Sequence, residues 1–382
     1  MMDNNLLYHC LKQVYNNISL KPTIKVFDFS PELQKIEPDI HIDGLYTPGH
    51  YVNKGFNTLT NLCVINFNKL GYKVVVKIYF SNKIPNMRGI IKEIILRIYT
   101  MLYLFETEKI PYEIVMLLYE LPRIIPCYFK KGRNEINTIG ELGYFNCTNG
   151  YYQHQGNKKF IVITRYNDCM GLLIHELSHA VGLDVGAYDT FKQWEDFYYE
   201  RFNGKCGHFT EGINNATASI IHCMLLSIKY NKDFYAILKK EKEYVYKCCC
   251  KLIKFYIKDT DKKEYTIDDL KGIYTQLGQM FEYNILRYIY LENCDNFYNF
   301  KNINNLTEKE KKILTEKIPQ GFCHSIMWMY PNDKPTMTNY FNLFISKLQE
   351  QKFNIKDLKE DYTNNGIKYF NMDYFNMNFN LY

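Results

Sequence analysis

The stretch Gly171-Leu-Leu-Ile-His-Glu-Leu-Ser-His-Ala-Val-Gly182 contains two histidines, His175 and His179, four positions apart. In an α-helix this spacing places both side chains on one face, about 5.4 Å apart along the axis. Both imidazoles can therefore reach a single metal ion. Glu176 follows the first histidine, where its carboxylate can hold a metal-bound water.

The residues around the two histidines favour a helix whose opposite face is buried. Glu176 is the only charged residue between Gly171 and Val181, and no proline interrupts the run. The apolar positions that would form the buried face are Leu172, Leu173, Leu177 and Val181. Gly182 is suited to end the helix. The sequence therefore predicts a metal-binding helix from about residue 167 to residue 182.

The composition limits the classes of protein to consider. At 382 residues, with 47% apolar and 23% charged residues, the chain resembles a soluble globular protein with a sizeable core. Its net charge of +6 is small and its basic residues are scattered among acidic ones, so nucleic acid is not an expected partner. The sequence shows no signal peptide and no membrane span. Twelve cysteines without regular spacing favour free thiols, and hence a cytoplasmic protein.

The chain is expected to have an α+β fold, with a small N-terminal mixed β/α sheet subdomain packed on a mainly helical C-terminal subdomain. The metal site would lie between the two. Residues 1–60, with four prolines, would be an N-terminal arm that wraps the fold. Residues 61–166 would form the α/β subdomain with an edge strand, and residues 167–232 the metal-binding helices. Residues 233–382 would form a helical subdomain with an Asn- and Tyr-rich tail.

Local patterns predict the main elements of these regions. Runs of Val, Ile and aromatic residues predict strands at 62–67, 72–80, 125–129 and 159–164. Helical spacing predicts helices at 86–106 and 111–119 before the metal-binding helix. The chain after residue 182 is expected to be almost wholly helical, with one long helix from 267 to 292.

A catalytic zinc usually takes three protein ligands, and the sequence offers two sources for the third. The first continues from Gly182, as in the metzincin motif His-Glu-x-x-His-x-x-Gly-x-x-His/Asp. That motif would place the ligand at Val185, whereas the nearest carboxylate, Asp184, comes one position early. Residues 325–330 resemble the Met-turn of the same family. The second source is Glu211, in the first turn of a later predicted helix.

The segment Thr210-Glu-Gly-Ile-Asn-Asn-Ala-Thr-Ala218 resembles the sequences with which gluzincins supply a glutamate ligand. This resemblance implies that His175, His179 and Glu211 bind Zn²⁺. In thermolysin-like enzymes an aspartate four residues after the glutamate orients the first histidine, and Asn215 occupies that position here. The Asn215 amide oxygen can accept the ring N–H of His175, but without the charge that raises ligand basicity.

The order of strand 159–164, the His175/His179 helix and the Glu211 helix resembles a zincin of the gluzincin type. In that fold an edge strand flanks the cleft above the metal-binding helix. Residues 161–165, 173–184 and 279–290 are similar to uncharacterised HExxH proteins of large DNA viruses. The similarity implies a viral protein made in the cytoplasm of an infected cell, and it brings no known substrate.

The function expected from these features is that of a zinc-dependent metallopeptidase acting on a peptide or protein. Glu176 would take a proton from the zinc-bound water and pass it to the leaving amine. The donor to the oxyanion stays open among His154, His208, His324 and tyrosines such as Tyr283 and Tyr290. One alternative is a zinc-stabilised, catalytically inactive scaffold or binding protein of the same fold, which Asn215 favours. Another is an interaction protein in which the motif arose by chance. The sequence does not indicate the oligomeric state.

Overall fold

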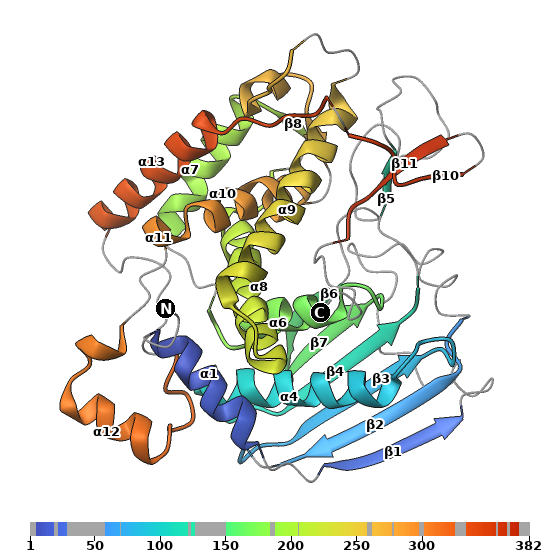
Figure 1. Cartoon of the computed structure of the whole chain (residues 1–382), viewed down its shortest axis with the longest axis vertical. Coiled ribbons are helices and arrows are strands. Elements are labelled where there is room, and N and C mark those ends of the chain that lie inside the picture. Colours follow the sequence, from blue (N-terminus) through green and yellow to red (C-terminus); the bar gives the residue numbers. More distant parts are fainter. Residues whose placement is uncertain are drawn as a thin grey trace.

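The described part of the chain is a mixed α+β fold built mainly of a six-stranded sheet and a group of helices (Figure 1). The computed structural model describes residues 5–18, 22–28, 58–68, 70–120, 124–126, 150–183, 188–204, 206–257, 262–276, 279–297, 302–324, 334–356, 358–364 and 367–373. Within these residues, no helix combines the length and the apolar character needed to cross a membrane.

The sheet has the strand order β1-β2-β3-β4-β7-β6. Its strands are β1 (Thr23–Asp28), β2 (Asn61–Phe67), β3 (Val74–Phe80), β4 (Tyr112–Leu118), β6 (Gly150–Gln155) and β7 (Lys158–Thr164). β3, β4 and β7 are parallel, whereas β1, β2 and β6 run antiparallel to their neighbours. The strand expected at 159–164 is therefore an inner strand, and the edge beside it is β6, which the sequence analysis did not predict.

The helix predicted at 111–119 is wrong, because these residues form β4. The strand pairs with β3 on one side and with β7 on the other, and five of its seven residues form the buried run Ile114–Leu118. Inner strands of parallel sheets are apolar on both faces. Such a short apolar run has no alternation, so periodicity alone does not distinguish it from a buried helix.

Helices cover one face of the sheet (Figure 1). The described α-helices are α1 (Leu6–Asn17), α4 (Met87–Phe105), α6 (Cys169–Ala180), α7 (Tyr188–Tyr199), α8 (Phe209–Tyr230), α9 (Phe234–Tyr256), α10 (Arg287–Glu292), α11 (Cys294–Phe297), α12 (Glu308–Glu316) and α13 (Lys334–Glu350), and α6 packs on β6 and β7. α4 connects β3 to β4, α6 follows β7, α8 packs on α6, and α9 packs on α8. One apolar core extends from Leu6 to Met372 through the sheet face and these helices.

Two described parts of the expected arm over residues 1–60, α1 and β1, pack into the fold. α1 begins where the Asn5 side chain accepts the Tyr8 amide at 3.0 Å, and its apolar side is buried against α4 and α8. β1 extends the sheet by pairing with β2. The buried apolar residues of α1 recur at helical spacing: Leu6, Leu7, Cys10, Leu11 and Val14. Residues 29–57 of the expected arm lie outside the described residues.

The long helix predicted from 267 to 292 is also wrong. The segment contains a short 3₁₀ helix η2 (Ile267–Leu270), a strand β9 (Thr275–Gln276), a π-turn η3 (Glu282–Leu286) and α10. Gly272 has a φ of 73°, a left-handed conformation that ends helical geometry. The Gln276 side chain then accepts the Phe281 amide at 3.0 Å, and β9 pairs with β8 (Asn203–Gly204).

The expected Asn- and Tyr-rich tail is docked where it is described. β10 (Tyr362–Asn364) and β11 (Ile367–Asn371) form a small sheet with β5 (Ile124–Pro126). β5 is the described part of the strand predicted at 125–129. The last nine residues lie outside the described ranges.

Candidate metal centre

α6 carries His175, Glu176 and His179 and ends as the sequence predicts. Gly182 has a φ of 73°, and its amide donates to the His179 carbonyl at 3.0 Å. The Leu183 amide donates to the Ser178 carbonyl at 2.9 Å. This pair of hydrogen bonds is a Schellman motif, which stops a helix at a left-handed glycine. The second histidine, His179, therefore lies in the last turn of α6, just before the chain leaves the helix.

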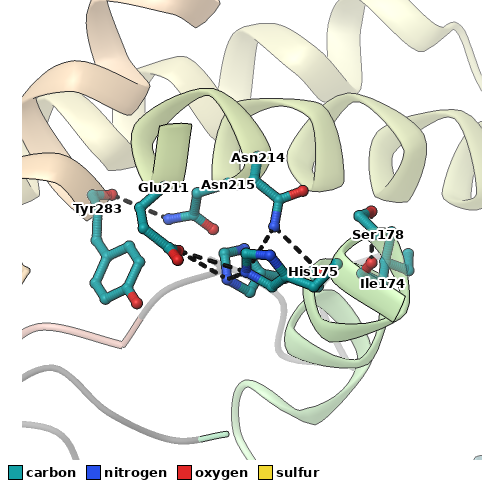
Figure 2. Close-up of polar contacts among 8 residues, drawn as sticks. Ile174, His175, Ser178, Glu211, Asn214, Asn215 and Tyr283 are labelled. Atoms are coloured by element: carbon teal, nitrogen blue, oxygen red, sulfur yellow. Dashed lines mark hydrogen bonds and ion pairs between the residues drawn. The ribbon is translucent and has the colours of Figure 1, made fainter. Parts of the chain in front are cut away.

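The side chains of His175, His179 and Glu211 come together between α6 and α8 (Figure 2). Their possible ligand atoms all lie within 4.8 Å of one another. The two imidazole Nε2 atoms are 3.2 Å apart. Glu211 Oε2 lies 3.4 Å from the Nε2 of His175 and 3.5 Å from that of His179. The third residue that the sequence analysis placed in this group is therefore beside the other two.

These three separations fit a small metal ion. Zinc ligands lie about 2.0–2.2 Å from the metal, which in a tetrahedron separates two donors by about 3.3–3.6 Å. The His175 side chain is 4% exposed, whereas those of His179 and Glu211 are 14% and 17% exposed. The group is thus closed on the His175 side and partly open on the other. Two imidazoles and one carboxylate form a donor set that suits zinc.

The first turn of α8 presents Glu211 to the two histidines. An acidic side chain is favoured there by the positive end of the helix dipole. Burial would raise the pKa of the Glu211 carboxyl, but the nearby imidazoles of His179 and His175 hold that pKa well below its ordinary value. Glu211 is therefore ionised, as a carboxylate ligand must be.

Asparagine 214 is the residue of this centre that the sequence analysis missed. Its amide nitrogen lies 2.9 Å from His179 Nε2 and 3.3 Å from the His175 carbonyl oxygen, so it ties α8 to α6. Asn215, which was expected to orient the His175 ring, donates to the Tyr283 carbonyl at 3.2 Å (Figure 2). The expected contact from Asn215 to the His175 ring stays a prediction. Asn214 and Asn215 are adjacent and of the same type, so the sequence did not indicate which of them faces the histidines.

The Glu176 side chain is buried beside the first residue of the edge strand. A Cβ atom on Gly150 would lie 3.0 Å from Glu176 Oε1 and 2.8 Å from the Val162 carbonyl oxygen. Because both separations are shorter than a normal carbon–oxygen contact, glycine is required where β6 begins. The proposed base therefore lies between the metal-binding helix and the edge of the sheet.

Tyr283 lies against the candidate ligands from a third element, the π-turn η3. Its ring meets the His175 ring edge to face, with centroids 5.9 Å apart and planes at 81°. π-turns inside helices frequently occur at functional sites because they redirect a side chain. From sequence, Tyr283 was one of several candidate tyrosines, and the regular helix predicted there offered no basis for selecting it.

Glu282, next to Tyr283, is fully buried behind the centre. Burial raises the pKa of its carboxyl to about 7, although hydrogen bonds from Gln276 and from backbone amides oppose the increase. The Nε2 atom of Gln276 donates to Glu282 Oε2 at 2.9 Å. The carboxyl therefore changes its charge near neutral pH.

This raised pKa predicts a specific dependence of stability on pH. Between about pH 4.5 and 7 the folded chain keeps a proton on Glu282 that the unfolded chain releases, so the free energy of unfolding falls as pH rises. Glu282→Gln removes this effect. We expect the variant to gain about 2–3 kcal/mol relative to wild type between pH 5 and pH 8. Urea unfolding with a chelator present measures it, and a pH-independent difference would contradict the prediction.

The remaining sequence candidates lie elsewhere or outside the described residues. His222 is buried within α8, as expected for a core residue, and burial lowers the pKa of its ring. His154, His208 and His324 are not part of the ligand group. Asp184, Val185 and residues 325–330, which carried the metzincin alternative, lie outside the described residues.

Comparison of the chain with protein-family models, with curated proteins and with solved structures finds no match. Function is therefore inferred from the chemistry of the centre and from the topology around it.

Proposed function

We propose that the chain is a zinc-dependent metallopeptidase of the zincin type. The observation that carries the proposal is the convergence of two imidazoles and one carboxylate at 3.2–3.5 Å separations, with Glu176 following the first histidine on the same helix. His175, His179 and Glu211 would hold Zn²⁺. A structural site has no need of a base at Glu176, whereas a hydrolase needs one there.

The topology around the centre supports the same proposal. An antiparallel edge strand, β6, precedes the inner parallel strand β7, which leads into the helix with the two histidines. This is the arrangement implied by the resemblance to zincins, in which an edge strand flanks the cleft. α8, which follows α6 and α7 in the chain, supplies the glutamate.

In this reaction, the residues of the centre would have separate roles. A bound zinc would supply positive charge that lowers the pKa of water and polarises a carbonyl. The Glu176 carboxylate would accept a proton from the attacking water and then donate it to the amine nitrogen released when the peptide bond breaks. Asn214 would hold α6 against α8 through the His175 carbonyl, so that the two histidines keep their positions.

A second candidate function is a zinc-stabilised scaffold or binding protein without hydrolytic activity. Asn214 favours it, because its buried amide lies 2.9 Å from His179 Nε2. With its oxygen turned towards the centre, this amide would be a fourth protein ligand, and closed four-ligand sites are typical of structural zinc.

Metal content and hydrolysis, measured on one preparation, test the proposal. We expect close to one zinc per chain by elemental mass spectrometry, and cleavage of members of a mixed peptide library. Cleavage should stop with a chelator and return when zinc is added back. Zinc without cleavage would favour the scaffold, and no zinc after loading with the metal would overturn both.

A further inference from the structure

The buried carboxyl of Glu282 joins the segments on which the candidate centre is built. Glu282 begins the π-turn η3, and its side chain is 0% exposed. Gln276, on β9, donates to it at 2.9 Å through Nε2. The Oε1 atom of the same glutamine accepts the Phe281 amide at 3.0 Å. One glutamine therefore fixes both the carboxyl and the backbone that enters the π-turn.

The other neighbour of the Glu282 carboxyl is the backbone that leads into α8. A Cβ atom on Gly207 would lie 2.4 Å from the carboxyl carbon of Glu282, so the carboxyl rests directly on this glycine. The Gly207 carbonyl accepts the Trp194 indole N–H at 2.8 Å. The segment before α8 is thus held between Trp194 on α7 and Glu282 on η3.

Both elements fixed by Glu282 continue directly into the candidate centre. Glu211, in the first turn of α8, lies four positions after Gly207, and Tyr283 is the residue after Glu282. Gly212 lets the two elements approach closely, because a Cβ there would lie 2.5 Å from Leu286 Cβ and 3.2 Å from the Glu282 carbonyl oxygen. A shift at this contact would move the Glu211 carboxylate and the Tyr283 ring relative to His175.

We propose that Glu282 is a positioning residue for the metal centre: its carboxyl fixes the start of α8 against η3 and so keeps Glu211 within ligand distance of His175 and His179. The inference rests on the metal binding of the proposed function and adds a residue outside the ligand set. The Glu282 carboxyl is not one of the three grouped donors. Residues that orient metal ligands are typically worth about 10–100-fold in metal affinity.

Zinc affinity of the full chain, measured by competition with a chromophoric chelator, tests this role. Glu282→Ala removes the anchor, and we expect it to weaken zinc binding by about 10–100-fold. Glu282→Gln retains the shape and a hydrogen-bonding oxygen, and it should bind within about threefold of wild type. The matched control is Glu241→Gln, which changes another buried carboxyl of the helical half, the partner of Arg287. It should lower the melting temperature without weakening zinc binding.

Near-wild-type zinc affinity in Glu282→Gln, together with weak binding in Glu282→Ala, is the result that a general loss of stability would not produce. Wild-type affinity in Glu282→Ala, or equal weakening in Glu282→Ala and Glu241→Gln, would overturn the proposal. If the wild type takes up no zinc, the proposed function fails separately, and hydrogen exchange then decides the positioning role. Faster exchange confined to residues 207–213 in Glu282→Ala would support it, and unchanged exchange there would overturn it.

Discussion

The Glu176→Gln variant is expected to bind zinc as the wild type does and to hydrolyse peptides about 10³-fold more slowly. Glutamine has the size of glutamate but no carboxylate to accept the proton of the attacking water, and general bases contribute about 10²–10⁴-fold. Glu176 is not one of the three grouped donors, so the metal should be retained. The measurement is kcat/KM together with zinc content on the same sample.

Glu316→Gln is the matched control, because Glu316 is an exposed carboxylate on α12, 67% exposed. It should leave both quantities unchanged. Retained turnover in Glu176→Gln would remove Glu176 from the mechanism. Loss of zinc together with turnover would instead mean that the carboxylate next to Gly150 holds the metal or its surroundings in place.

Glu211→Ala is expected to lose zinc. Two imidazoles without the carboxylate leave an incomplete ligand set, and the loss should exceed the ~10–100-fold that outer partners of metal ligands are worth. Elemental mass spectrometry after gel filtration should find well below one zinc per chain. A titration against a chromophoric chelator gives the size of the change. Hydrolysis should fall with the metal content.

His208→Ala provides the comparison for this variant, because His208 is exposed and lies just before α8, three residues before Glu211. It should keep its zinc. Unchanged zinc in Glu211→Ala would place the third ligand elsewhere in the chain, with Asp184 as the next residue to replace. Equal loss in both variants would indicate damage to the start of α8 rather than removal of a ligand.

The part of the centre on α6 could be predicted, because it depends only on residues that are close together in the sequence. His175, His179 and Gly182 lie within two turns, and helix geometry fixes how they relate. Glu211 came from a resemblance, since no spacing rule links residues on different helices. Whether Asn214 or Asn215 faces the histidines depends on how α8 crosses α6. The contact between Gly150 and Glu176 depends on which strand lies at the sheet edge.

The two wrong helix predictions have different physical causes. At β4, a buried inner strand has the continuous apolar character that a buried helix also has, and only its neighbours β3 and β7 decide the structure. Between residues 267 and 292, helical propensity was overridden by Gly272 and by the side chain of Gln276. The π-turn that presents Tyr283 follows that interruption in the chain.

The packing of α1 on α8 has a consequence for synthesis on the ribosome. Tyr8 and Ser227, whose hydroxyl oxygens are 3.0 Å apart, are separated by 219 positions in the chain. At about 5–20 residues per second, α1 waits roughly 10–40 s for α8 to be translated. His175 and His179 likewise emerge before Glu211. The nascent chain therefore carries a first helix that lacks its α8 neighbour and an incomplete ligand set, and chaperone binding at that stage would influence the yield of folded protein.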